Sequence, residues 1–371
     1  MLPVSRPSIG VEELEAIKKV FETGWLGLGS IVFEFENKIK EYLEAKNVVA
    51  VNTGTAALHI ALDAIGIKEG DEVIVPSLTF CASIQAITAL GARPVFCEIN
   101  PDNLNMDISD AKNKITNKTK AIMPVHYCGQ ACDMDALMGI GKNYNIFIIE
   151  DAAHAFGSSY KGKKIGSFGD TTCFSFDNIK NLTCGEGGAV VLSDDRIAEL
   201  IRMKRILGID KDTWHRYKNE RNWFYEVTTQ GYRYHMSNIN AAIGIAQFKR
   251  LDLFIHRKKE IVEKYNDAFI NIEGVKILSW NLKETVPFIY IVRVLKGVRE
   301  DLIAFLKENG VGAGVHYSPN HLQSFFKPFE TSLPVTELIA EEIITLPLYY
   351  DMTNEQVSIV IDAVSDFFNH R

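Results

Sequence analysis

The sequence predicts an α/β protein with a mostly parallel central sheet sandwiched by helices, and with a smaller C-terminal α+β domain. In the first half of the chain, short apolar runs alternate with helix-length segments, which is typical of a parallel sheet covered on both faces. Two further runs, at residues 171–176 and 189–193, indicate a hairpin that adds strands of mixed direction. Near residue 251 a long, charged amphipathic helix begins and the pattern changes. We therefore expect a large domain at residues 1–250 and a small domain at residues 251–371.

The individual elements follow from composition and periodicity. Apolar and β-branched runs predict the strands of the large domain at residues 47–51, 71–76, 92–99, 120–127 and 145–153. Helical segments are expected between them at residues 55–66, 80–91 and 133–144. In the small domain a charged amphipathic helix, an apolar run and two further helices are expected at residues 250–270, 286–294, 299–310 and 354–368.

Bulk composition excludes several classes of function. The chain has 371 residues and a net charge of −7, so bulk attraction to nucleic acid is not expected. No apolar run reaches the roughly 18 residues that a membrane span needs. The first residues lack the apolar centre of a signal peptide, so a cytoplasmic location is expected. The six cysteines are expected to be free thiols, and Cys128 and Cys132 lack the further ligands of a zinc site.

In an open parallel sheet, ligands bind beyond the carboxyl ends of the strands, so the residues that follow each strand are the candidates for function. Thr53, Gly54 and Thr55 follow the first strand and open a helix. Free backbone N–H groups and the helix dipole make such a start a phosphate cradle. A threonine N-cap without any ligand is the alternative. ATP and NAD are poor candidates, because neither of their glycine-rich motifs is present.

A second group of candidates follows two other strands. Glu150 and Asp151 end a strongly apolar strand, where a carboxylate must find a cation or several donors. The protonated ring nitrogen of a cofactor would serve, and capping of the next helix is the alternative. His154 can share the same pocket or be a structural histidine. Phe80 can stack on a planar cofactor or pack in the core.

The stretch FSFDNIKNLTCGEGG (residues 174–188) places Lys180 between two apolar strands and beside a glycine-rich turn. A buried ammonium is costly unless it is paired or neutral. A surface lysine at a hairpin tip is the alternative. Together, a phosphate-binding helix start, an aromatic ring, an acid for a pyridinium and a buried amine match one cofactor, pyridoxal 5′-phosphate (PLP).

The sequence resembles the DegT/DnrJ/EryC1/StrS family of sugar aminotransferases, which has the PLP fold type I. The resemblance covers essentially the whole chain, and the lysine motif followed by T-x-G-E-G-G is its most specific part. It is carried by the segments GWLGLG, EDAAHA, FSFDNIKNLTCGEGG, GYRYHMSNINAA and VHYSPNHLQ. The resemblance implies that Lys180 forms the Schiff base with PLP, that Asp151 pairs with the pyridinium nitrogen and that Phe80 stacks on the ring. It also implies that Gly54, Thr55, Ala56 and Ser175 form the phosphate site. His154 would lie near the ring oxygen of the cofactor.

The sequence departs from the family pattern at three positions. Arg233 stands where many relatives have Asn, and His235 stands where they have Arg. That Asn reaches the cofactor phosphate of the other subunit, so the resemblance implies a homodimer with shared sites. Arg233 could bind the same phosphate or the nucleotide phosphates of a substrate. Asp177 stands where His is common. The residues expected on the sugar side are Trp25, Asp177, His316, Tyr317 and His321. For the four other than Asp177, aromatic packing between domains is the alternative.

The reaction that the resemblance implies is amino transfer from L-glutamate to a nucleotide-linked keto sugar. The first choice of acceptor is dTDP-4-keto-6-deoxyglucose, which would give a 4-amino-4,6-dideoxy sugar for surface polysaccharide, such as the O-antigen of lipopolysaccharide, or for a secondary metabolite. We expect burial and a nearby cation to lower the pKa of Lys180, so that its amine can react and then move protons.

Other reactions remain to be weighed against this one. A 3-keto sugar or a GDP- or UDP-linked sugar is an alternative acceptor. Dehydratase relatives replace the lysine with His, so the intact Lys180 disfavours them. A cysteine desulfurase would need a reactive loop cysteine, and Cys184 occupies a small-residue position of the family. A regulator with a PLP fold is disfavoured because both Asp151 and Lys180 are present.

Overall fold

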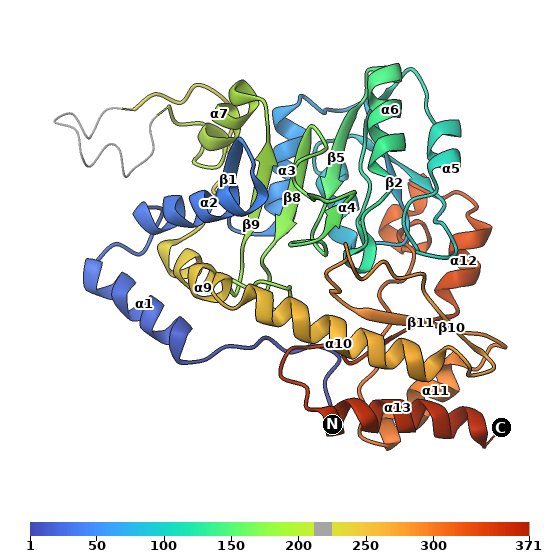
Figure 1. Ribbon diagram of the computed structural model, residues 1–371. Helices are drawn as coiled ribbons and strands as arrows, with labels where there is room; N and C mark the ends of the chain where they lie inside the picture. The colour runs from blue at the N-terminus through green and yellow to red at the C-terminus, as the bar shows by residue number, and fades with distance from the viewer. Residues whose placement is uncertain (211–224, 371) are drawn as a thin grey trace.

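The computed structural model describes residues 1–210 and 225–370. Its main sheet is mostly parallel, as predicted, and Figure 1 shows it at the centre of the molecule. The seven strands lie in the order β1 (Asn47–Val51), β9 (Gly188–Leu192), β8 (Thr171–Ser175), β5 (Phe147–Asp151), β4 (Thr119–Ile122), β2 (Glu72–Pro76) and β3 (Arg93–Cys97). Strands β8, β5, β4, β2 and β3 pair in parallel, whereas β9 is antiparallel to both of its neighbours. The predicted hairpin of mixed direction is therefore confirmed.

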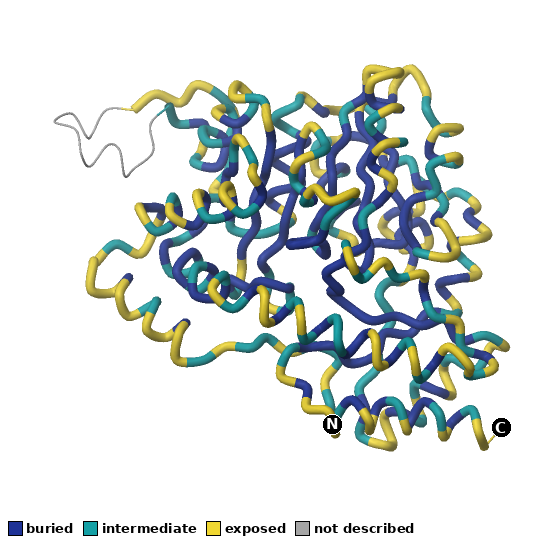
Figure 2. Tube along the Cα trace, in the orientation of Figure 1, coloured by how far each residue is buried: buried dark blue, intermediate teal, exposed yellow. Residues whose placement is uncertain are grey.

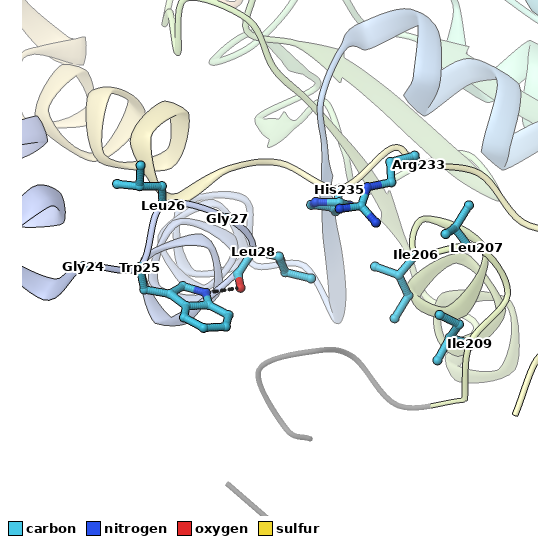
Figure 3. Close-up of a pocket in the computed structure, with 10 residues that line it drawn as sticks. All are labelled: Gly24, Trp25, Leu26, Gly27, Leu28, Ile206, Leu207, Ile209, Arg233 and His235. Carbon is cyan, nitrogen blue, oxygen red and sulfur yellow. Dashed lines mark hydrogen bonds between the residues drawn. The ribbon is translucent and has the colours of Figure 1, made fainter. Parts of the chain in front are cut away.

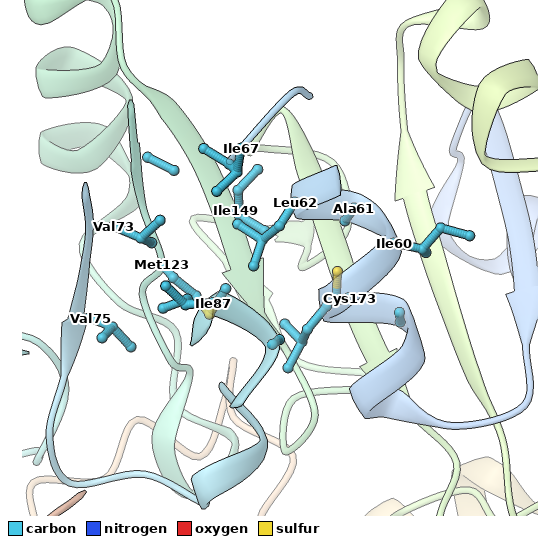
Figure 4. Close-up of a cluster of buried hydrophobic side chains, with 14 of the residues drawn as sticks. Ile60, Ala61, Leu62, Ile67, Val73, Val75, Ile87, Met123, Ile149 and Cys173 are labelled. Carbon is cyan, nitrogen blue, oxygen red and sulfur yellow. The ribbon is translucent and has the colours of Figure 1, made fainter. Parts of the chain in front are cut away.

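Helices cover both faces of this sheet because successive side chains of each strand point to opposite faces. On one face Val49 and Val51 pack with α3 (Gly54–Ala64), α4 (Cys81–Thr88) and α7 (Asp195–Lys204), and Figure 4 shows part of this cluster. On the other face Val48 and Ala50 pack in a cluster with α2 (Ser30–Leu43). A neighbouring cluster on that face holds α5 (Ile108–Asn113) and α6 (Met134–Tyr144). The strands are accordingly the most buried part of the molecule (Figure 2).

Two further helices complete the N-terminal part. Helix α1 (Val11–Thr23) packs against α9 (Asn238–Phe248), which also contacts α2. Side-chain caps fix several helix starts: Asp133 accepts a hydrogen bond from the amide of Ala136, and Ser237 accepts one from the amide of Asn240. The short elements are β6 (Ser159–Tyr160), β7 (Lys163–Lys164), η1 (Tyr127–Gly129), η2 (Asn320–Leu322) and η3 (Ser324–Phe329).

The C-terminal part is built on an antiparallel sheet of three strands, in the order β10 (Val275–Ile277), β11 (Tyr290–Val294) and β12 (Ile343–Leu346). Its helices are α10 (Leu251–Phe269), α11 (Arg299–Glu308), α12 (Pro334–Ala340) and α13 (Asn354–Asn369). Helix α10 runs from the main sheet to this smaller sheet, and the N-terminus lies beside α13 (Figure 1). The first residues belong to this region, because Leu2 bridges to Val311 and the amide of Leu348 donates to the carbonyl of Val4. The division at residue 250 stays a prediction.

The described residues contain no helix that is long and apolar enough to cross a membrane. Within the same ranges, no cluster of three or more His, Cys, Asp or Glu side chains is arranged to hold a metal ion. All six cysteines are free thiols, and only Cys81 is exposed.

Candidate active site

Four strands bring the candidate residues to one edge of the main sheet. Gly54 follows β1, Phe80 follows β2, Asp151 ends β5 and Ser175 ends β8. These four strands run in the same direction, because β1 and β8 are both antiparallel to β9 and the others are parallel to β8. Their carboxyl ends therefore meet at one edge, which is where an open parallel sheet binds its ligands.

Lys180 lies in the loop between β8 and β9, and its amine is enclosed rather than extended into solvent. The Nζ atom is 4.0 Å from the ring centroid of Phe288. Burial lowers the pKa of Lys180 to about 8, although the charges of Asp151 and Asp177 act in the opposite direction. A substantial fraction of this amine is therefore neutral near pH 8, and a neutral amine is a nucleophile and a base.

Asp151 is buried, and both of its carboxylate oxygens are held. Its Oδ2 accepts a hydrogen bond of 2.6 Å from Ser83 Oγ, and its Oδ1 accepts one of 3.1 Å from the amide of Ala153. The Ser83 hydroxyl is itself 3.1 Å from Thr79 Oγ1. Burial raises the pKa of Asp151, while these hydrogen bonds and the charge of the nearby Lys180 limit the shift. Sequence reasoning missed Ser83, although it lies in the first turn of the helix that follows Phe80.

Glu150 points to the opposite face of the sheet and has structural partners. Its Oε2 lies 2.8 Å from His126 Nε2, and its Oε1 accepts hydrogen bonds from the amide of Gly169 and the hydroxyl of Thr172. His126 Nδ1 accepts the amide hydrogen of Cys132, so the ring carries its proton on Nε2 and donates it to Glu150. Of the two acids predicted at this strand end, only Asp151 is therefore near Lys180.

Aromatic side chains surround the Lys180 amine. Phe80 is 55% exposed, and its ring centroid is 5.6 Å from that of Tyr317. The Tyr317 hydroxyl is 3.2 Å from His154 Nε2, and the His154 ring lies 4.3 Å from that of Phe288. Burial and the nearby Lys180 and His316 lower the pKa of His154 well below its usual value, so this ring is neutral. An exposed aromatic face beside a strand end is available to stack on a planar ligand.

The start of α3 is the segment predicted to bind a phosphate group. Thr53 caps the helix, because its Oγ1 accepts a hydrogen bond of 3.0 Å from the amide of Ala56. A Cβ atom on Gly54 would lie 2.7 Å from Ser175 Cβ, and one on Gly188 would lie 2.4 Å from the carbonyl oxygen of Thr53. Only glycines let these backbone segments meet, and the first amides of a helix have no partner within it. The cradle therefore fits a phosphate group such as that of PLP.

Buried polar atoms near Lys180 also fit a bound cofactor. His154 Nδ1 is buried and has no hydrogen-bond partner among the described residues. Asp151 offers a buried carboxylate whose hydrogen-bond donors leave room for a cationic group. A pyridinium ring carrying a hydroxyl and a phosphate would supply partners of the required kinds.

A second cavity holds one predicted substrate residue, Trp25, and one predicted cofactor residue, Arg233. Trp25, Arg233 and His235 line a separate cavity of about 290 Å³, in which Arg233 and His235 project side by side from one wall (Figure 3). Trp25 faces this cavity from the loop at residues 24–28, and its Nε1 donates to the carbonyl of Leu28. Lys180 does not line this cavity. Within one subunit, Arg233 therefore lines a cavity that Lys180 does not line.

The remaining candidates differ in their surroundings. His316 Nδ1 is 2.9 Å from Thr345 Oγ1, and burial and Lys180 lower the pKa of this histidine. His321 is buried with both ring nitrogens in use, because Nδ1 is 2.6 Å from Ser77 Oγ and Nε2 is 3.2 Å from Glu337. These contacts hold the His321 ring in place beside the end of β2, and its role as a substrate residue stays a prediction. Asp177 lies in the Lys180 loop, where its charge acts on that amine.

Comparison with known proteins identifies the family. The sequence profile described as "DegT/DnrJ/EryC1/StrS aminotransferase family" matches residues 7–365. The chain is 40% identical to the spore coat polysaccharide biosynthesis protein SpsC of Bacillus subtilis, over 98% of this chain and 96% of that protein. The aminotransferase TlmJ of Streptoalloteichus hindustanus superposes with a TM-score of 0.94 at 33% identity, covering 100% of this chain and 99% of that chain.

The putative sugar aminotransferase Spr1654 of Streptococcus pneumoniae, in its PMP form, also superposes with a TM-score of 0.94, at 30% identity and with full coverage of both chains. A PLP form of the same protein superposes with a TM-score of 0.92. The fold, the Lys180 amine near the Asp151 carboxylate, and these similarities all support the same family and cofactor. This chain therefore belongs to the DegT/DnrJ/EryC1/StrS aminotransferase family and is a PLP-dependent transaminase.

Proposed function

We propose that this enzyme transfers the amino group of L-glutamate to a nucleotide-linked 4-keto-6-deoxy sugar, with dTDP-4-keto-6-deoxyglucose as the first candidate. The observation that carries the proposal is the enclosed Lys180 amine beside the buried Asp151, in a chain whose structural neighbours are sugar aminotransferases. The name of the Bacillus subtilis relative supports a role in polysaccharide assembly. A 3-keto sugar or a GDP- or UDP-linked sugar is the second candidate.

Different site residues would contact different parts of PLP. Gly54, Thr55 and Ala56 at the start of α3, with Ser175, would bind the phosphate. Asp151 would hold the ring nitrogen, Phe80 would stack on the ring and His154 would contact the ring oxygen. When bound, PLP supplies an electron-withdrawing ring that stabilises negative charge on carbon during amino transfer.

Lys180 would act as the attachment point and then as the proton carrier. Attachment needs the neutral amine, and the pKa of about 8 makes that form accessible at neutral pH. The freed Nζ atom would then take the proton from Cα of the donor and deliver it to the cofactor carbon that receives the amino group. In the second half-reaction it would move a proton in the opposite direction, from that carbon to the carbon of the acceptor sugar. The rings of Phe288, His154 and Tyr317 enclose this space and limit its hydration.

In a homodimer, Arg233 would act in the site of the partner subunit. Lys180 does not line the cavity of Arg233 within one subunit, so we propose that Arg233 binds cofactor or substrate phosphates of the neighbouring subunit. Helix α1 supports association because Val11, Leu14 and Phe21 are all at least 60% exposed. The proposed contacts to the sugar nucleotide remain Trp25, Asp177, His316, Tyr317 and His321.

The reaction is tested by its two half-reactions. With L-glutamate alone, we expect the absorbance of the bound cofactor to change and one equivalent of 2-oxoglutarate to form. A panel of nucleotide keto sugars should then restore the first spectrum, with the amino sugar identified by mass spectrometry and NMR. Absence of any change with L-glutamate would contradict the proposed donor. Restoration by a 3-keto or a UDP-linked sugar, but not by dTDP-4-keto-6-deoxyglucose, would contradict only the acceptor.

The phosphate cradle makes a separate prediction for Gly188→Ala. The added Cβ would collide with the carbonyl of Thr53 and displace the start of α3. We expect the affinity for PLP to fall by about tenfold or more, because charge-assisted hydrogen bonds to the phosphate are lost. A fluorescence titration of the apoprotein measures this affinity. Gly139→Ala is the matched control, since its Cβ would meet open space; equal affinities in the two variants would exclude the cradle.

A further inference from the structure

A small cavity lies behind Lys180, between the N-terminal segment, the Lys180 loop and α10. Its volume is about 20 Å³, which admits a single small group and excludes a sugar or a nucleotide. The charged side chains that line it are Arg6, Lys180 and Lys258. Within the described part of the chain, no carboxylate lines this cavity. Three basic side chains without an acid form an environment that favours an anion.

Lys258 is the buried cation of this cavity. Its side chain comes from α10, the residue is only 6% exposed, and its Nζ donates a hydrogen bond of 2.8 Å to Asn181 Oδ1. The partner of its ammonium group is thus a neutral amide oxygen, and no carboxylate lines the cavity among residues 1–210 and 225–370. The Phe288 ring centroid lies 4.0 Å from Lys180 Nζ and 6.0 Å from Lys258 Nζ, so the two amines flank one ring. A buried ammonium without a counter-ion is costly, so this amine is suited to a ligand that brings negative charge.

The N-terminal segment at residues 5–8 forms another wall of the cavity and is held in place by hydrogen bonds. Gln247 and Arg250 both donate to the carbonyl of Ser8, at 2.8 and 3.0 Å. The Ser8 hydroxyl donates to Asp351, and the amide of Leu348 donates to the carbonyl of Val4. Asp351 thus holds the wall and does not line the cavity. The cavity is therefore formed before any ligand binds.

We propose that this cavity is the subsite for the α-carboxylate of the amino donor and that Lys258 is its main cationic contact. The inference rests on the proposed function, in which Lys180 moves a proton at Cα of an amino acid. The α-carboxylate is bonded to that same carbon, so an anion site that has Lys180 as a wall is in the right place for it. The size of the cavity suits one carboxylate group.

The charge state of Lys258 gives the subsite a pH dependence. The groups that face it are Lys180 and Arg6, with Tyr349 and Tyr350 also lining the cavity. Burial and the nearby Lys180 lower the pKa of Lys258 to about 7. Lys258 is thus charged below pH 7 and loses its charge as the pH rises. Because a carboxylate binds the charged form, its affinity is expected to fall as the pH rises through 7.

The test is calorimetric binding of glutarate, an unreactive dicarboxylate with the carbon chain of glutamate, to the holoenzyme. Below pH 7 we expect Lys258→Met to weaken binding about 10- to 100-fold, because a charged hydrogen bond is lost. Lys258→Arg should retain most of the affinity, since it keeps the charge. Binding to the wild type should weaken above pH 7, and Lys258→Met should lack this change. A wild type that does not bind glutarate, or a Met variant that binds it equally well, would overturn the proposal.

Single-turnover rates with L-glutamate and L-isoglutamine identify the carboxylate that binds. L-isoglutamine carries an amide in place of the α-carboxylate, so it should be a poor donor for the wild type and no poorer for Lys258→Met. If the wild type uses both donors equally, the subsite does not bind the α-carboxylate. If no donor reacts but glutarate still binds through Lys258, the proposed function fails while the anion site stands.

Discussion

Lys180→Ala is expected to abolish both half-reactions of amino transfer while leaving the fold intact. The variant removes the amine that attaches the cofactor and that moves the proton at the donor Cα. We expect a loss of about 10⁴-fold or more, at or above the upper range of general acid–base catalysis. The loss is measured as the single-turnover rate of the first half-reaction with L-glutamate and of the second half-reaction with the acceptor sugar. A variant that still transaminates at the wild-type rate would refute the assignment.

Lys180→Arg is the control that separates a nucleophile from a positive charge. The guanidinium of arginine stays protonated at all relevant pH values, so it can neither attach the cofactor nor accept a proton. We expect this variant to be as inactive as Lys180→Ala.

In the wild-type apoprotein, the rate of cofactor attachment should rise with pH and level off above about 8, because the pKa of Lys180 is lowered to that value and only the neutral amine reacts.

Asp151→Asn is expected to have the second largest effect. The amide keeps the size of the side chain and removes the negative charge that would hold the ring nitrogen of the cofactor. Loss of one preorganised electrostatic contact at a reacting group costs about 10²- to 10³-fold in kcat. We expect a fall of this size in the single-turnover rate, together with a shifted absorbance of the bound cofactor.

Glu150→Gln is the matched control for Asp151→Asn. Glu150 is the adjacent residue of the same strand, but it points to the other face and bonds His126, Gly169 and Thr172. Its replacement should lower the melting temperature, because a buried network loses a charged acceptor. It should change the single-turnover rate far less than Asp151→Asn does. If both variants lose the same activity, the account of Asp151 as the acid of the site is wrong.

The sequence was sufficient for the main sheet and for the residues at its strand ends. Apolar runs and helical periodicity located the strands, and parallel strands bring their carboxyl ends together by geometry. For this reason Gly54, Phe80 and Asp151 could be assigned to one edge from the sequence pattern, whereas Ser175 was implied by the family resemblance. The strand β12 was missed, because its short apolar run IITL has no alternation that separates it from a loop or a helix end.

Residues that reach the site through tertiary packing could not be found in this way. Lys258 lies in a charged amphipathic helix, where any single lysine looks like part of the solvated face. Ser83 and Phe288 have no chemical signature apart from their neighbours in space. Glu150 and Asp151 are adjacent acids, and only the direction of each side chain shows which one faces Lys180. The partners of the His321 ring could not be predicted either, because Ser77 and Glu337 come from distant segments.

The central claim is that the Lys180 amine is the attachment point of PLP. Borohydride reduction of the PLP-loaded enzyme, followed by peptide mass spectrometry, tests it most directly, because reduction fixes the cofactor to whichever lysine holds it. We predict that the added mass lies on the peptide that contains Lys180 and is absent from Lys180→Ala. Labelling of Lys258 in place of Lys180, or of neither lysine, would contradict the account.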